Sequence, residues 1–466
     1  MSQVAFSRML VVFAFSFIAI ASRAGDEQGC IDAADDIVEK LSCLEDVTFA
    51  EVRSAISGIR HFEMKFRQPV DHESPDRGDF LQRVVLLHRS EIEPMVLQTS
   101  GYSIFGVRLT AIANLFSTNQ IQIEHRFFSD SVPANLDWSK LNIKQSADDF
   151  HQITSKLKKI YKTKWVNTGA SKGGMTSIYH RFFYPDDLDG TVADVAPHSF
   201  STSDERYAEF VRNVGGEAYR ECRENFKNLQ IQLLQNRDLF TPDIKGDFSQ
   251  LGSAEVAFEH SVIESVFYFW QYGSPDSKTE GCSAIPTEDV REMYKYLQSV
   301  ADISDYLNSS ISPFLPYYFQ AATQLGNPAN AIDHLMDLLQ FDLNIDQYTP
   351  KGVDYSYSNE DMLLIDQWVR QSADKVIFIY GEFDPWTAGE FPVSSTGLDV
   401  KKYYAPKGNH GAKFTNLSRD QYAEVVDTLA LWLNKSASRN AVLNSLNPKN
   451  ITLEDEEFLF RKKHKL

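Results

Sequence analysis

A serine lies in the segment 169–173, which reads GASKG and has the form G-x-S-x-G. Residues 164–168 before it have the β-branched and aromatic character of a short strand, and residues 175–184 after it can continue as a buried helix. Strand, sharp turn and helix are the context of a nucleophile elbow, where small residues are needed because the neighbours of the serine crowd it. An ordinary Gly-rich turn between a strand and a helix has the same pattern, so this segment alone makes Ser171 a candidate nucleophile and nothing more.

An acid and then a histidine must follow the serine if it is activated as in an α/β-hydrolase. Asp384 follows the predicted strand 375–380, and the proline after it prevents that strand from continuing. His410 follows a second predicted strand, 400–404, and is flanked by small and turn-forming residues. Either residue alone is ordinary for a loop. Together with Ser171 they have the required order, and each follows a strand, so the sequence predicts a catalytic triad.

This triad would attack a carbonyl group. His410 would take the proton of the Ser171 hydroxyl, and Asp384 would hold the imidazole in the correct tautomer and stabilise its charged form. These roles are filled by side chains alone, so we expect neither a cofactor nor a metal.

The oxyanion that forms in such an attack needs fixed N–H donors. The first candidate is the backbone N–H of Lys172, the residue after the nucleophile. The loop after the predicted strand 95–99 should supply the second donor. We expect the Tyr102 N–H, because the preceding Gly101 allows close backbone approach, although a plain turn would have the same residues.

The N-terminal segment 1–24 has the pattern of a secretory signal peptide. Arg8 gives a short basic start, residues 9–21 are apolar or small without interruption, and residues 22–24 offer a small-x-small cleavage site. The apolar run is too short to span a bilayer comfortably, which favours a cleaved signal over an uncleaved anchor. We therefore expect a secreted or periplasmic chain that has no membrane association after cleavage.

The chain has four cysteines, Cys30, Cys43, Cys222 and Cys282. An even number in an exported chain indicates disulfides. Three pairings are possible, and we expect Cys30–Cys43 with Cys222–Cys282 because this pairing keeps each bridge within one region. Free buried cysteines are the alternative, and the spacing is not that of metal ligands.

The formal net charge is −18, and loss of Arg8 and Arg23 with the signal would lower it by two more. An acidic surface argues against nucleic-acid binding. It suits a cationic partner such as the amino terminus of a peptide, although solubility alone explains it equally well.

The length allows one large catalytic core with an insertion. Residues 25–199 read as alternating strands and helices, and residues 62–66 within them alternate apolar and polar as an antiparallel strand does. Residues 200–361 have helix-like apolar spacing and many aromatics, and they lie between nucleophile and acid, where hydrolases of this class accept a helical cap. Residues 362–466 return to strand, strand and a helix, which begins with a capping box at Ser418. We predict an α/β-hydrolase fold with a core in two parts and a helical cap.

Several motifs make the chain resemble the exported serine peptidases of the PS-10 type, peptidase family S37. They are QPVDH at 68–72, TSGY at 99–102, EHRFF at 124–128, GASKGGM at 169–175 and GEFDPW at 381–386. The related prolyl-carboxypeptidase and dipeptidyl-peptidase II family, S28, has similar motifs, but its elbow usually reads GSYGG, which places this chain nearer S37. The resemblance implies an α/β-hydrolase with a helical cap, cleavage near peptide ends, and a frequent preference for proline-containing substrates. It also implies the same triad, Ser171, Asp384 and His410.

Glu124 follows the predicted strand 120–123, near the mouth of the expected site. Its carboxylate could bind the ammonium group of a substrate and so measure the distance from the peptide's end. It could equally pair with Arg126 or another base and brace the elbow. The aromatic segment 266–270 also has two interpretations, a proline pocket or, as its helical context favours, core packing.

The sequence therefore predicts a serine exopeptidase that releases short peptides, foremost proline-containing tripeptides, from free amino termini. The Streptomyces members of S37 are prolyl tripeptidyl aminopeptidases, which supports this choice. The alternatives are an enzyme like prolyl carboxypeptidase or dipeptidyl peptidase, a lipase or esterase with the same triad, and an exported binding protein on an inactive hydrolase fold. The intact triad argues against the binding protein. The expected partner is a peptide substrate, and the oligomeric state stays open.

Overall fold

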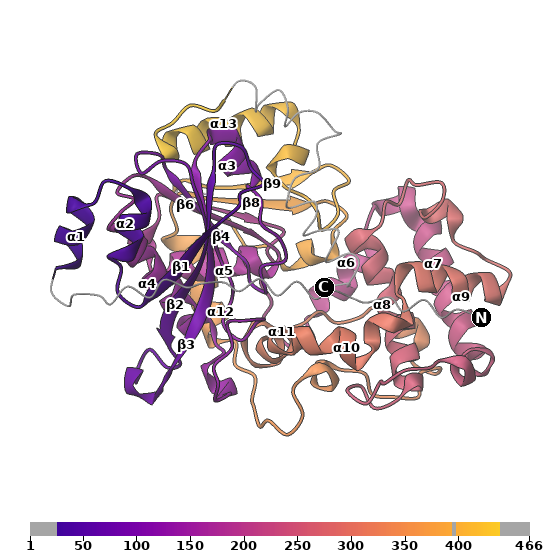
Figure 1. Cartoon of the computed structure of the whole chain (residues 1–466). Helices are drawn as coiled ribbons and strands as arrows, with labels where there is room; N and C mark the ends of the chain where they lie inside the picture. The colour runs from indigo at the N-terminus through magenta and orange to yellow at the C-terminus, as the bar shows by residue number, and fades with distance from the viewer. Residues whose placement is uncertain (1–25, 394–397, 439–466) are drawn as a thin grey trace, which may run out of the picture.

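The computed structural model describes residues 26–393 and 398–438. At its centre lies one sheet of nine strands (Figure 1). The strands are β1 (Val47–Val52), β2 (Arg60–Pro69), β3 (Asp79–His88), β4 (Met95–Thr99), β5 (Asn119–Ile123), β6 (Trp165–Ala170), β7 (Gly190–Asp194), β8 (Val376–Gly381) and β9 (Val400–Ala405). The signal peptide predicted at residues 1–24 lies outside the described residues.

The strand order is β1-β2-β3-β5-β4-β6-β7-β8-β9. The pairings from β1 to β5 are antiparallel, and those from β5 through β4 to β9 are parallel. The alternation predicted for residues 62–66 is present in β2, whose residues alternate between buried and less buried. A mostly parallel sheet with an antiparallel start and helices on both faces confirms the predicted α/β-hydrolase fold. The carboxyl ends of its parallel strands meet at one edge, so the loops after β6, β8 and β9 lie near one another.

Helices cover both faces of the sheet. Neighbouring residues of a strand point to opposite faces, so each strand contributes side chains to both helix layers. The helices around the sheet are α1 (Glu27–Ala33), α2 (Ile37–Ser42), α3 (Ala111–Phe116), α4 (Ile143–Lys158), α5 (Lys172–Phe183), α12 (Glu360–Gln371) and α13 (Arg419–Leu433). Val96 and Ile377 pack with α3 and α13 on one face. On the other face, Leu97 packs with α1, α2 and α4, and Phe378 packs with α5 and α12.

Between β7 and β8 the chain is helical, and we call residues 205–348 the cap segment. Its α-helices are α6 (Glu205–Asn213), α7 (Arg220–Gln235), α8 (Ala254–Tyr272), α9 (Val290–Val300), α10 (Asn308–Ile311) and α11 (Leu315–Gln320). Figure 1 shows α6 to α10 beside the sheet, on the side away from α1 and α2. The cap segment has its own apolar core, in which Phe226, Phe258 and Trp270 are buried. The proposed boundary at 361 falls in the first turn of α12, a helix that packs on the sheet and so belongs to the core.

Two disulfides tie local regions together. Cys30 bonds to Cys43 between α1 and the end of α2, and Cys222 in α7 bonds to Cys282. The predicted nearest-neighbour pairing is confirmed. None of the helices in residues 26–393 and 398–438 is both long and apolar enough to cross a membrane.

Candidate active site

Ser171 occupies the sharp turn between β6 and α5. Its backbone angles are φ 54° and ψ −125°, a region that residues with a side chain rarely adopt. The Ser171 N–H donates to the carbonyl of Asp194 at the end of β7 (2.9 Å), and the Ser171 carbonyl accepts from the Met175 N–H (2.9 Å). These two bonds hold the strained backbone in place, so the geometry is that of a nucleophile elbow.

The glycines around Ser171 are required by close contact between α5 and β4. A Cβ atom at Gly169 would lie 2.5 Å from the Gly173 backbone and from Thr99 Oγ1, and one at Gly173 would lie 2.5 Å from the Thr99 carbonyl oxygen. Thr99 Oγ1 also hydrogen-bonds to the Gly173 carbonyl (2.6 Å). No side chain fits at either position, which is the physical reason for the GASKG pattern.

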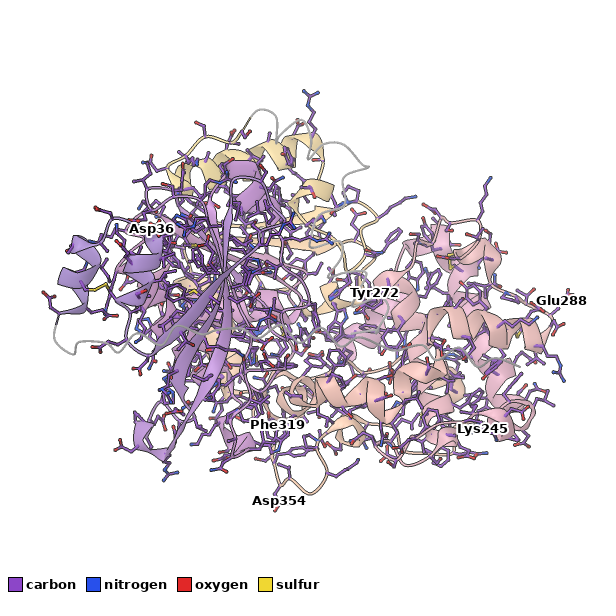
Figure 2. All side chains as sticks on the ribbon, viewed as in Figure 1. Asp36, Lys245, Tyr272, Glu288, Phe319 and Asp354 are labelled. Atoms are coloured by element: carbon purple, nitrogen blue, oxygen red, sulfur yellow. A yellow bond between two sulfur atoms is a disulfide. The ribbon has the colours of Figure 1, made fainter. Side chains whose placement is uncertain are left out.

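The structure brings Asp384 and His410 together. His410 Nδ1 lies 2.7 Å from Asp384 Oδ2, and the Asp384 side chain is fully buried. Burial raises the pKa of Asp384, and His410 acts against that rise. The backbone N–H of His410 donates to the backbone carbonyl of Gln271 at the end of α8 (2.9 Å), so the cap segment helps to place the histidine. Tyr272, which follows Gln271 in the chain, is labelled in Figure 2 and lies where the cap segment meets the sheet.

The second ring nitrogen of His410 is the one that would take the proton of Ser171. This Nε2 atom is buried and makes no hydrogen bond within the residues that the structure describes. Catalytic hydrogen bonds of this kind are often long without substrate and tighten when it binds. The arrangement therefore offers an acceptor nitrogen, oriented by a buried carboxylate, at the sheet edge that carries the strained serine.

The two expected oxyanion donors differ in their surroundings. Lys172 is the first residue of α5, where backbone N–H groups have no partner within the helix. Gly101 approaches this helix end as expected, since a Cβ atom there would lie 2.6 Å from the Gly173 nitrogen. The Tyr102 N–H, however, donates to the Ser100 carbonyl (2.8 Å) and to Ser100 Oγ (3.2 Å). Use of this N–H in an oxyanion hole would require both of these bonds to open.

The side chain of Lys172 has a role that the sequence analysis did not identify. It is buried, and its Nζ donates to the Gly101 carbonyl (2.6 Å). The same nitrogen lies 5.5 Å from the ring centre of Tyr102 and 5.3 Å from that of Phe128. The lysine thus fastens the loop after β4 to the elbow.

Glu124 is fully buried at the end of β5, and its carboxylate is occupied by donors of the protein. Oε2 accepts from the Ile104 N–H (3.0 Å), while Oε1 accepts from Ser131 Oγ (2.9 Å) and the Asp130 N–H (3.2 Å). Arg83 Nη1 lies 3.8 Å away. Burial raises the pKa of Glu124. Of the two roles considered for this residue, these contacts favour the brace over the ammonium ligand.

Two of the sequence motifs meet at a carboxylate that the sequence analysis missed. Asp149 of α4 accepts two hydrogen bonds of 2.7 Å from the buried Arg126 guanidinium. His72 Nε2 lies 2.7 Å from the same carboxylate. The QPVDH and EHRFF motifs are therefore joined through α4, and Arg126 pairs with Asp149 rather than with Glu124.

A cavity of about 400 Å³ lies beside the triad, between the cap segment and the loop that carries Asp384. Trp386 lines it, and the Trp386 ring centre is 5.9 Å from that of His410. All members of the aromatic segment 266–270 pack in the cap core or against it. Core packing therefore applies to the whole segment, and Phe267 and Tyr268 in addition line the cavity.

Comparison with known proteins shows the family of this chain. The model of the PS-10 peptidase S37 family matches residues 31–449. Over 413 residues the chain is 34% identical to the prolyl tri/tetrapeptidyl aminopeptidase of Streptomyces mobaraensis, with 85% of each chain covered. It is 23% identical over 384 residues to the probable serine protease EDA2 of Arabidopsis thaliana, covering 70% of this chain and 75% of that one.

Among solved structures, the proline iminopeptidase of Mycobacterium smegmatis matches with a TM-score of 0.36 and 12% identity, covering 79% of this chain and 99% of that chain. This TM-score is low, so the fold is assigned from the strand order instead. The family match and the relative at 34% identity carry the identification. The chain belongs to the PS-10 peptidase S37 family, and it is a serine peptidase.

Proposed function

We propose that this serine aminopeptidase releases short peptides, foremost tripeptides, from the free amino termini of proline-containing peptides. The observation that carries the proposal is the strained Ser171 at the same sheet edge as the Asp384–His410 pair. Support for the substrate class comes from the relative named prolyl tri/tetrapeptidyl aminopeptidase. The two disulfides support the further proposal that the enzyme is exported, because such bonds persist in oxidising compartments.

In the proposed reaction, Ser171 Oγ attacks the scissile carbonyl while His410 Nε2 takes its proton. The Lys172 N–H donates to the oxyanion, and the Tyr102 N–H would join it if its bonds to Ser100 open. When the tetrahedral intermediate collapses, the C–N bond breaks and His410 returns the proton to the leaving amine. Water, deprotonated by His410, then cleaves the acyl-enzyme and regenerates the Ser171 hydroxyl.

Mass spectrometry of the products tests this proposal. The substrate is a proline-containing peptide of about ten residues, supplied with a free or an acetylated amino terminus. We expect an amino-terminal tripeptide from the free peptide, little product from the acetylated one, and none with Ser171→Ala. Products released from the carboxyl end would favour the carboxypeptidase alternative. Hydrolysis of a short ester without any peptide cleavage would favour the esterase.

A further inference from the structure

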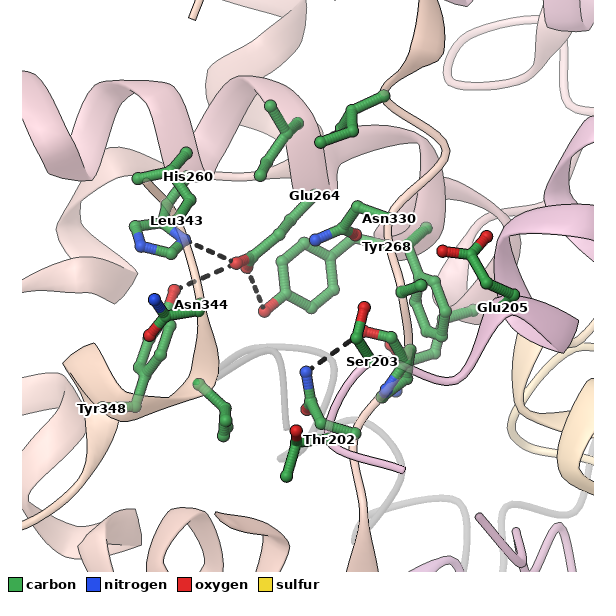
Figure 3. A pocket seen from close by; sticks show the side chains of 18 of the residues that line it. Thr202, Ser203, Glu205, His260, Glu264, Tyr268, Asn330, Leu343, Asn344 and Tyr348 are labelled. Carbon is green, nitrogen blue, oxygen red and sulfur yellow. Dashed lines mark hydrogen bonds and ion pairs between the residues drawn. The ribbon is translucent and has the colours of Figure 1, made fainter. Parts of the chain in front are cut away.

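Glu264 lines the cavity, and its carboxylate lies among donor groups (Figure 3). Its Oε1 accepts from His260 Nδ1 (2.9 Å) and from the Tyr348 hydroxyl (3.0 Å). Its Oε2 accepts from the hydroxyls of Tyr306 (2.9 Å) and Tyr268 (3.2 Å). Four donors from separate turns of the cap segment therefore hold one carboxylate in a fixed position.

The charge of Glu264 has no basic partner other than a histidine. Within the described residues, no lysine or arginine forms an ion pair with Glu264, and His260 is its one ion-pair partner. The other ring nitrogen of His260, Nε2, lies 2.8 Å from Gln347 Oε1, so both nitrogens of this ring face acceptor oxygens. The Glu264 side chain is 17% exposed, so the carboxylate is partly buried, and a cation that enters the cavity would stabilise it further.

The tyrosines around Glu264 also favour a cationic ligand. Burial raises the pKa of Tyr268, Tyr306 and Tyr348, and the charge of Glu264 raises these pKa values further, so the hydroxyls stay protonated. Each hydroxyl proton is used on Glu264, so the oxygens of Tyr268 and Tyr348, which line the cavity, can only accept a hydrogen bond from any other group. Tyr318, whose ring stacks on that of Tyr348 with centres 4.7 Å apart, also lines the cavity. Acceptor oxygens and aromatic faces are the surroundings that an ammonium group requires.

The position of Glu264 relative to the triad fits a short peptide. Glu264, Phe267 and Gln271 lie on one face of α8 and line the cavity. Gln271 marks the triad end of that face, because its carbonyl accepts from the His410 N–H. The seven steps from Glu264 to Gln271 rise about 10 Å along the helix. About three residues of extended peptide cover the same distance.

We propose that Glu264 and its tyrosine cage bind the free α-ammonium group of the substrate and thereby set the length of the released peptide at about three residues. This inference rests on the proposed aminopeptidase function. Residues 1 to 3 of the substrate would extend along α8, past Phe267 and Trp386, to the scissile bond at Ser171.

The test compares Glu264→Gln with the wild type on one peptide with a free or an acetylated amino terminus. We expect kcat/KM for the free peptide to fall about ten- to hundredfold, mainly through KM, since a hydrogen bond to a charged group is lost. The value for the acetylated peptide should change little, so the ratio of free to acetylated should approach one. The rate of fluorophosphonate labelling at Ser171 should not change, because the triad is untouched.

Two further variants keep the test decisive. Tyr348→Phe removes one acceptor oxygen and should also lower the ratio, which decides the question if Glu264→Gln does not fold. Glu205→Gln is the matched control, because Glu205 is an exposed carboxylate that lines the cavity away from Glu264 (Figure 3). We expect it to change the ratio less than twofold. An unchanged ratio in Glu264→Gln and Tyr348→Phe, or a collapse in Glu205→Gln alone, would overturn the inference. Failure of the proposed function is a different result, namely a wild type that the fluorophosphonate does not label.

Discussion

Asp384 Oδ2 and His410 Nδ1 lie 2.7 Å apart because the strands that precede them are neighbours in the sheet. β8 and β9 pair in parallel, with Gly381 opposite Ala405 at their carboxyl ends. The acid and the histidine therefore begin their loops side by side. Sheet register brings the two loops together, and the bond from the His410 backbone N–H to the Gln271 carbonyl completes the placement of the histidine.

Asp384→Asn should lower kcat by about 10⁴ while leaving some activity, because the amide favours the wrong tautomer of His410. Ser171→Ala should abolish both hydrolysis and covalent labelling. Steady-state kinetics and fluorophosphonate labelling measure the two effects, and circular dichroism checks that both variants are folded. Full activity of a folded Ser171→Ala variant would remove the proposed mechanism.

Gly169→Ala should abolish activity and destabilise the protein, because the new Cβ would lie 2.5 Å from the Gly173 backbone. Overpacking of this kind costs about 1–3 kcal/mol. Gly106→Ala is the matched control, since a Cβ there meets nothing within 4 Å. Urea denaturation and peptide hydrolysis of both variants provide the measurement. Equal stability of the two variants would show that the elbow can relax around a methyl group.

The local elements of this fold could be predicted because their signals are local. Residues 95–99 form β4 as expected, and the capping box at Ser418 begins α13. Both depend on a few consecutive side chains. The triad could be proposed for a related reason, since its order in the chain and the strands before each member are properties of the sequence.

The functions of the buried charges could not be predicted, because they depend on distant segments. Glu124 reads as a carboxylate at a strand end, and only the folded loops show that Ile104 and Ser131 occupy it. Glu264 lies in an apolar helix pattern, and its tyrosine partners come from later turns of the cap segment. The hydrogen bonds of the Tyr102 N–H to Ser100 are a matter of loop conformation that spacing does not encode.

Acid should destabilise the protein through His198, whose burial lowers its pKa to about 4. An unfolded histidine binds a proton below about pH 6.5, whereas the folded His198 does not until about pH 4. The unfolded state therefore gains protons first, and the free energy of unfolding falls as the pH decreases through this window. The loss from this residue is roughly 3 kcal/mol at pH 4.

His198→Phe should reduce that slope, because the replacement ring does not titrate. The ring of His198 stacks on that of Phe391 with centres 4.4 Å apart, so an aromatic ring suits the site. The free energy of unfolding from urea titrations between pH 4 and pH 7 measures the change. A slope equal to that of the wild type would assign the acid sensitivity to other groups, such as His125, whose pKa burial also lowers.

Glu124→Gln should lower stability without changing the preference for free over acetylated substrates. The carboxylate accepts hydrogen bonds from Ile104, Asp130 and Ser131 on its two oxygens. A glutamine keeps one oxygen, so its NH₂ group must face donors of one of the two loops. Leaving a buried donor without an acceptor costs about 1–3 kcal/mol.

Urea denaturation of Glu124→Gln and of Glu51→Gln measures the stability difference. Glu51 pairs with Arg60 at the surface, where loss of one ion pair costs about 1 kcal/mol or less. The ratio of kcat/KM for free and acetylated peptide, measured on the same preparations, separates the two roles of Glu124. A brace leaves the ratio unchanged and lowers the urea midpoint. A collapsed ratio with an unchanged midpoint would instead make Glu124 the ammonium ligand, and the cavity around Glu264 would then have to bind another part of the substrate.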